Sequence, residues 1–191
     1  MAIPTSELQS INPSAVIELF ELQLIASIHG SDQLFRWHSG SNQNGNGEIV
    51  WQGNTYARFP VEAEGFEFTG RGQIPRPTLL VSNILSTLTT LMATVNAFTP
   101  ANDLNGAKLT RIRTLASNLD AANFSGGSNP FGTPSADKFP DEIYFLDRKV
   151  LENRQFVKYE LVSALDLTNV RVPKRQITRK DFPGVGTFID Q

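Results

Sequence analysis

The sequence contains no cysteine, only two histidines, and few charged residues, which make up 19% of its 191 positions. The missing thiols exclude disulfides, cysteine nucleophiles, thiolate zinc sites and cysteine-ligated iron–sulfur clusters within these residues. No apolar run reaches the roughly 18 to 20 residues that cross a bilayer. Residues 1–6 also lack the basic and apolar stretches of a secretory signal. We therefore expect a protein that folds in a cytoplasm.

The overall charge excludes two further classes of protein. The chain has seventeen basic and nineteen acidic residues, which gives a formal net charge of −2. This balance argues against a protein that binds mainly by neutralising phosphates, and against a polybasic membrane-surface binder. Hydrophobic residues make up 40% of the chain, enough for a core in one domain or two small ones.

Alternation of apolar and polar residues predicts short β-strands along most of the chain. In residues 15–25, for example, Leu22 and Leu24 lie on either side of Gln23. Pro60 is expected to end a hairpin, because it removes a ladder donor. Similar patterns, separated by turn residues, lie at 33–38, 48–51, 55–59, 65–68, 78–81, 108–115, 143–151 and 155–162.

One segment, at about 83–97, has the 3.6-residue period of a helix. Ser82 or Asn83 could cap its N-terminus. Its opposite face is rich in threonine and uncharged, so we expect it to be packed or half-buried. The apolar positions are Ile84, Leu85, Leu88, Leu91, Met92 and Val95, and the threonines are Thr87, Thr89, Thr90 and Thr94.

These patterns predict a mainly β fold, an antiparallel β-barrel or sandwich with one central α-helix. We assign this domain to residues 1–169. It includes a Gly/Pro/Ser-rich loop at 125–137, of a length that is often functional. Residues 170–191 are predicted to form an extended arm, whose basic residues are Arg171, Lys174, Arg175, Arg179 and Lys180.

No catalytic, cofactor-binding or metal-binding residue is predicted. His29 and His38 could bind a metal or act as a base, but each borders a turn or polar loop, so we expect exposed or half-packed side chains. The pairs Gly70-x-Gly72 and Gly184-x-Gly186 do not join a strand to a helix and indicate tight turns. Nor is there a Gly-x-Ser-x-Gly elbow. We therefore expect no enzyme. The basic arm has only Phe182 and Phe188 for base stacking, so nucleic-acid binding is not expected either.

Several short segments occur together in a recognisable order. Each is weak alone, but the ordered set resembles the minor tail protein L family of long, flexible-tailed bacteriophages, from about Ala15 to Ile177. The segments are Ile49–Tyr56, Phe59–Val61, Gly65–Phe68, Gly70–Gly72, Arg76–Pro77, Val81–Asn83, Leu151–Arg154, Glu160–Leu161, Ala164–Leu167 and Val172–Ile177.

The resemblance implies a structural virion protein that is made in the host cytoplasm. It would lie in the tail tip, linking the tail tube end to the central host-recognition hub and supporting tail assembly. A homo-oligomeric ring of tube-like β-barrels is expected, with a trimer favoured. Further partners would be neighbouring tail-tip proteins, the central fibre or hub protein and the tape-measure end, with no specific nucleic acid and no membrane. The Thr-rich helix face and the 125–137 loop are the candidate subunit contacts.

The family usually continues into a Cys-x-Trp-x-Tyr segment and further cysteines that hold an iron–sulfur cluster. The first of these would fall near Phe182, so we expect no cluster with this chain alone and treat Phe182 as an apolar anchor. The alternative function is a surface- or carbohydrate-binding β module, in which Trp37 and Trp51 would line a groove. A cell-wall hydrolase would need a catalytic constellation that we do not find.

Overall fold

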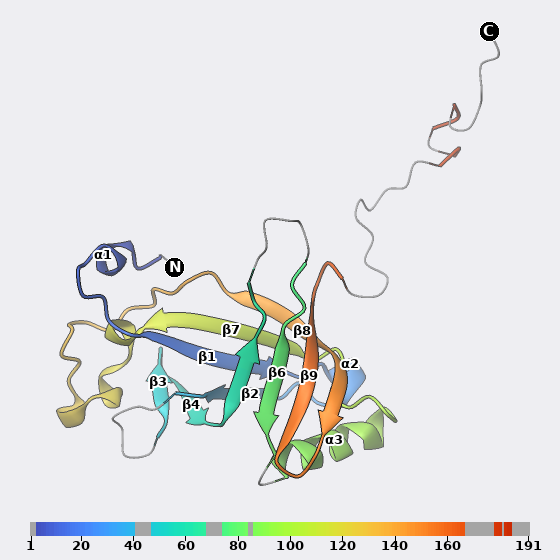
Figure 1. Ribbon diagram of the computed structural model, residues 1–191, viewed down its shortest axis with the longest axis horizontal. Coiled ribbons are helices and arrows are strands. Elements are labelled where there is room, and N and C mark those ends of the chain that lie inside the picture. Colours follow the sequence, from blue (N-terminus) through green and yellow to red (C-terminus); the bar gives the residue numbers. More distant parts are fainter. Residues whose placement is uncertain are drawn as a thin grey trace.

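A computed structural model describes residues 3–40, 47–67, 74–83, 86–166, 178–180 and 182–184 (Figure 1). The fold is mainly β, as the alternating sequence predicts. Three α-helices accompany nine strands among the described residues: α1 (Thr5–Leu8), β1 (Val16–Gln23), α2 (Ala26–His29), β2 (Leu34–His38), β3 (Ile49–Trp51), β4 (Asn54–Arg58), β5 (Val61–Glu64), β6 (Thr78–Ser82), α3 (Thr87–Phe98), β7 (Lys108–Leu115), β8 (Glu142–Glu152) and β9 (Phe156–Ser163).

The nine strands form one sheet in the order β3-β4-β2-β1-β7-β8-β9-β6-β5. Neighbouring strands are antiparallel as predicted, with the exception of β2 and β4, which run parallel. The exception arises because the hairpin β3–β4 places its second strand, and not its first, beside β2. Strand alternation alone does not determine which strand of a hairpin pairs with a third.

One continuous segment, 54–64, contains both β4 and β5 and so joins distant parts of the sheet. The backbone N–H of Phe59 donates to the carbonyl of His38 at 2.9 Å. The next carbonyl, of Pro60, accepts from the N–H of Ser82 at 2.9 Å. The segment therefore bonds β2 on one side and then β6 on the other, which curls the sheet into a barrel that keeps β3 and β5 as edge strands.

Pro60 lies at the point where the segment changes neighbours, and it ends β4 as expected from its missing N–H. The chain nevertheless begins β5 directly afterwards, at Val61, where the sequence analysis placed no strand. The alternation predicted at 65–68 is not a strand over Gly65–Glu67, and Phe68 lies outside the described residues. Gly65, at a φ of +84°, turns the chain so that the buried Phe66 ring packs edge-on against Tyr144, with centroids 5.2 Å apart.

The main core lies between two crossing parts of this sheet. In Figure 1, β1 and β7 run across the direction of β5, β6 and β9. Strand β8 serves both parts, and its register shifts at Leu146/Arg148 and at Lys149/Leu151, where bulges bend it. The enclosed side chains come from both parts and include Phe20, Leu22, Leu109, Leu79, Val157, Tyr159 and Leu161.

Helix α3 covers one end of this core with Leu88, Met92 and Val95, the residues that the helical period assigned to the buried face. It begins at Thr87, later than the predicted 83, and Ile84 and Leu85 lie outside the described residues. The cap prediction is correct in one respect: Asn83 Oδ1 accepts the N–H of Thr89 at 3.4 Å, although Asn83 lies before the helix.

A second, smaller core lies around the β3–β4 hairpin, where Trp51 and Tyr56 pack with Leu19, Ile112 and Leu119. The long connection after β7 covers it with three short 3-10 turns. Asn123 Nδ2 holds this connection to β3 by donating to the Val50 carbonyl at 2.6 Å. Within the connection, Asn129 Nδ2 donates to the Ser117 carbonyl at 2.8 Å.

Candidate interaction surfaces

The two histidines are structural, and the prediction that they are exposed or half-packed is wrong. His29 is 2% exposed; its Nδ1 accepts the Ile25 N–H at 2.9 Å, and its Nε2 lies 3.1 Å from the Asn105 carbonyl. His38 is fully buried, with Nε2 2.8 Å from the Gly47 carbonyl. Burial lowers the pKa of His38, and the nearby Arg58 acts in the same direction. Backbone groups that bind the rings explain why both face inward.

The two tryptophans are buried as well. Trp37 packs against Phe59 with ring centroids 6.2 Å apart, and Trp51 donates its indole N–H to the Ser135 carbonyl at 3.3 Å. Their exposed fractions are 8% and 4%. Neither ring can line a surface groove, so the carbohydrate-binding alternative loses the residues on which it was based.

The arginines of β7 form a charged group at one mouth of the barrel. Arg111 contacts both Glu18 on β1 and Glu142 on β8, and Arg113 lies 2.7 Å from Glu142. The Arg111 guanidinium also stacks 4.4 Å from the centre of the Phe66 ring. An open hollow of about 650 Å³ is lined by Arg111, Arg113, Glu142 and Phe66, together with Ala63, Glu64, Gly65 and Glu67.

Strand β5 is an edge with a row of carboxylates. Glu62, Glu64 and the nearby Glu67 are exposed and form no ion pair within the described part of the chain. This row is not predicted from the sequence, because Pro60 lacks a ladder donor and is expected to end the extended structure. The alternation Val-Glu-Ala-Glu at 61–64 is the signal that could have revealed it.

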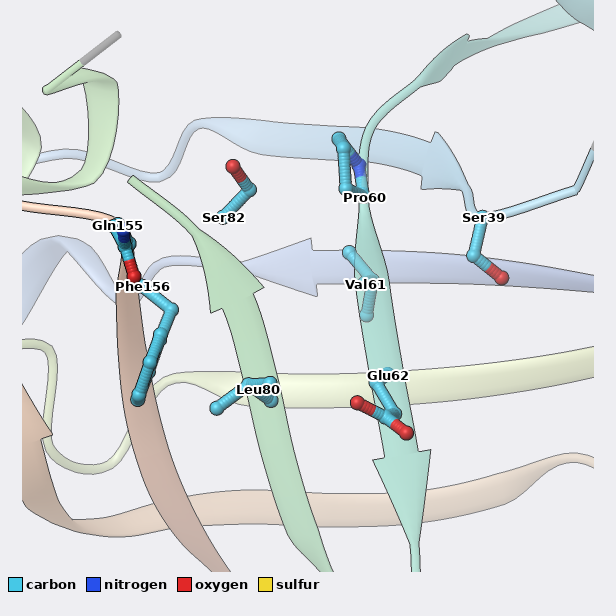
Figure 2. Close-up of a pocket in the computed structure, with 8 residues that line it drawn as sticks. All are labelled: Ser39, Pro60, Val61, Glu62, Leu80, Ser82, Gln155 and Phe156. Carbon is cyan, nitrogen blue, oxygen red and sulfur yellow. The ribbon is translucent and has the colours of Figure 1, made fainter. Parts of the chain in front are cut away.

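A second hollow, of about 310 Å³, lies at the Pro60 end of this edge (Figure 2). Figure 2 shows Leu80 and Phe156 on the neighbouring strands and Ser39 on the other side of Val61. The lining residues are Ser39, Pro60, Val61, Glu62, Leu80, Ser82, Gln155 and Phe156. The floor is largely apolar, which suits an aliphatic side chain more than a charged one.

The threonine-rich face of α3 is exposed, so the prediction that it is packed or half-buried is wrong for this chain by itself. Thr87, Thr90 and Thr94 are all exposed. The hydroxyls of Thr90 and Thr94 donate to the carbonyls four residues earlier, at 2.9 and 3.0 Å. These bonds satisfy the hydroxyls internally, and the face carries no charge along all twelve residues.

The 125–137 loop projects beside the smaller core, and it contains no strand or α-helix within the described residues. Phe131 is 58% exposed and meets Phe124 edge-on, with centroids 6.1 Å apart. The loop thus presents an aromatic ring on a base that Asn129 anchors. Arg111 and its ion-pair partners come from segments far apart in the sequence, as do the residues that hold the base of this loop. Local sequence patterns therefore could not predict that they meet.

Other predicted features lie wholly or partly outside the described residues. These are the Gly70-x-Gly72 pair, Gly186 and the first part of the arm, 170–177. The described residues contain no group of three or more His, Asp or Glu side chains that could hold a metal ion. They also contain no helix with the length and hydropathy of a membrane span. Since the sequence has no cysteine, these 191 residues do not fit a thiolate-held cluster.

Comparison with known proteins agrees with the resemblance found in the sequence. Residues 27–184 match the family model described as phage minor tail protein L. The tail tip protein L of Escherichia phage lambda is 33% identical over 125 residues, which cover 65% of this chain and 49% of that protein. The chain therefore spans about half the length of this curated relative. Because the family model covers most of the chain, this protein belongs to the phage minor tail protein L family and is a structural component of a phage tail.

Proposed function

We propose that this protein forms part of the tail tip, where it links the distal end of the tail tube to the central host-recognition hub and supports tail assembly. The observation that carries the proposal is the family match over residues 27–184, most of it within the barrel. Trp37 and Trp51 are buried, so they cannot form the aromatic groove of the carbohydrate-binding alternative, which favours a structural role. The protein would be made in the host cytoplasm and incorporated into the virion.

We further propose that copies pack side by side in a ring about the tail axis, with three copies favoured. The exposed face of α3 supports this arrangement, because threonine methyls with internally bonded hydroxyls resemble the uncharged core of an interface more than a solvated surface. The loop carrying Phe131 is the second candidate contact. A ring requires two different complementary patches, and these two surfaces can supply them.

Substitutions on the helix test the ring. Thr90→Glu with Thr94→Glu places two charges on the α3 face and should prevent incorporation into tails, while the purified chain still unfolds cooperatively. Thr55→Glu, on the exposed side of β4, is the matched control and should be incorporated normally. Normal incorporation of the double variant would show that this helix face is not a subunit contact.

Cryo-electron microscopy of virions tests the function itself. Density for this barrel in the tail tip, between the tube and the central hub, is the expected result, and it would also give the copy number. Deleting residues 170–191 should leave the barrel folded but block tip assembly, because we propose that this arm becomes ordered on assembly. Absence of the chain from intact particles would overturn the proposed function.

A further inference from the structure

Charge is divided unevenly between the two parts of this chain. Residues 1–169 contain twelve basic and seventeen acidic side chains, a formal net charge of −5. Residues 170–180 carry five basic side chains and no acidic one. With Asp181 and Asp190, the whole arm 170–191 has a net charge of +3, beside −5 for residues 1–169. Such complementarity steers association between oppositely charged surfaces.

The barrel offers this basic segment an open sheet edge. Strand β5 pairs with β6 on one side and has no strand on the other within the described residues. The Pro60 carbonyl accepts from Ser82, so antiparallel alternation directs the backbone groups of Glu62 and Glu64 toward β6. The N–H and C=O of Val61 and Ala63 therefore face the open side, where an added strand could bind them.

We propose that residues 170–177 of a second copy bind this edge as an added antiparallel strand. The inference rests on the proposed ring, since it assigns one of the contacts between neighbouring copies. The described residues 178–180 and 182–184 are all exposed and stand clear of their own barrel in Figure 1. This placement favours binding of the segment to β5 of a neighbouring copy over binding to β5 of the same chain.

Pro173 determines which residues of the segment face β5. Proline has no N–H, so it must point away from the edge, together with Arg171 and Arg175. The backbone N–H groups of Val172 and Lys174 then donate to the free carbonyls of β5, and their own carbonyls accept from its free N–H groups. In antiparallel pairing, this phase puts Val170, Val172 and Lys174 on the same face as Val61 and Ala63.

The same phase places Arg171 and Arg175 on the face that carries Glu62 and Glu64, where opposite charges on adjacent strands attract. Lys158, on β9, is the cation that shares this face across β6. Parallel pairing would instead put the arginines on the face of Val61 and Ala63, and Val172 on the face of the carboxylates.

Disulfide trapping tests the inference, since the chain has no cysteine of its own. One preparation of the full chain carries Ala63→Cys and another carries Val172→Cys, and the two are mixed and oxidised. A paired strand holds opposite Cα atoms about 5.5 Å apart, within the range that a disulfide bridges. The expected product is a linked species of twice the 21.1 kDa monomer mass that contains both variants.

Arg171→Cys is the matched control for strand phase, because its side chain would lie on the opposite face from Ala63. It should link to Ala63→Cys at least about tenfold more slowly than Val172→Cys does. Adding Glu62→Gln and Glu64→Gln to the acceptor should lower the rate of linkage about fivefold, as two cross-strand ion pairs of ordinary strength would. Unchanged urea midpoints of the single variants confirm that the barrel remains folded.

Three results would overturn the inference. They are no linkage in the mixture, equal linkage by Arg171→Cys, and linkage confined to a chain that carries both cysteines, which would mean a strand within one copy. The assay uses purified protein, so it is separate from the test on virions. A chain found in the tail tip that does not link would refute the added strand and leave the proposed function standing.

Discussion

Replacing Tyr56 with phenylalanine should destabilise the barrel through the loss of one hydrogen bond. Tyr56 is 1% exposed in the smaller core, and its hydroxyl donates to Glu21 Oε1 at 2.8 Å. The same carboxylate oxygen accepts from Arg36 Nε at 3.0 Å. Phenylalanine leaves no cavity, so the cost is the hydrogen bond itself, about 1.5 to 3 kcal/mol for a charged acceptor.

We expect about 1.5 kcal/mol, the lower end of this range, because the Glu21 side chain is 22% exposed and water can replace the phenol. For a domain of this size, the loss corresponds to a decrease in Tm of about 3 to 6 °C. Urea unfolding followed by tryptophan fluorescence is the assay. Both reporting rings, Trp37 and Trp51, are buried in the folded barrel.

Tyr159→Phe is the matched control. Tyr159 is also 1% exposed, but its hydroxyl donates to the sulfur of Met92 at 2.9 Å, a weak acceptor. Its replacement should cost less than that of Tyr56. Equal costs for the two variants, or a change within about 0.3 kcal/mol for Tyr56→Phe, would refute the assignment of stability to the Glu21 carboxylate.

The pH dependence gives a second check on the same group. Burial, followed by the hydrogen bond to Glu21, raises the pKa of Tyr56 in the folded state. Its contribution to stability is therefore complete below the unfolded pKa of about 10 and is lost as the pH rises above that value. The difference in unfolding free energy between the wild-type chain and Tyr56→Phe should shrink above about pH 10.

Three further predictions concern the main core, a surface ion group and metal content. Leu161→Ala removes a fully buried side chain and should cost about 3 kcal/mol of unfolding free energy in urea; a loss below about 1 kcal/mol would contradict close packing there. Lys149, 2.7 Å from Glu152 and 3.0 Å from Asp103, helps to lower the pKa of both carboxyls. The stability that depends on these charges is present above the unfolded pKa values and lost as the pH falls, so the advantage of wild type over Lys149→Met should shrink between about pH 5 and 3. Iron analysis of the purified chain should find no stoichiometric metal, whereas iron–sulfur absorption would contradict this.

Much of the fold could be predicted from local patterns. The strands β1, β7, β8 and β9 and the buried face of α3 follow directly from periods of two and 3.6 residues, because burial on one side imposes those periods. The strand order could not be predicted, since the paired residues of β7 and its partners lie 31 to 99 positions apart in the sequence. No local signal encodes such pairing.

The errors have physical causes in particular residues. Pro60 was read as a stop, but a proline can stand where a strand changes neighbours, because neither neighbour needs its N–H there. His29 and His38 lie beside turns, yet backbone groups bind their rings and bury them. The uncharged threonine face of α3 favours packing, yet its threonines are exposed in the described part of the chain.

The position of β9 has a consequence for how each copy is made. This strand, at 156–163, lies between β8 and β6, and β6 ends more than 70 residues earlier in the chain. During translation, β6 and the closing strand β5 therefore leave the ribosome long before their neighbour exists. The barrel cannot close until β9 emerges, and pairing this distant in sequence is slow to form. A nascent chain therefore exposes apolar strand residues throughout that interval, and these exposed residues make it prone to aggregation.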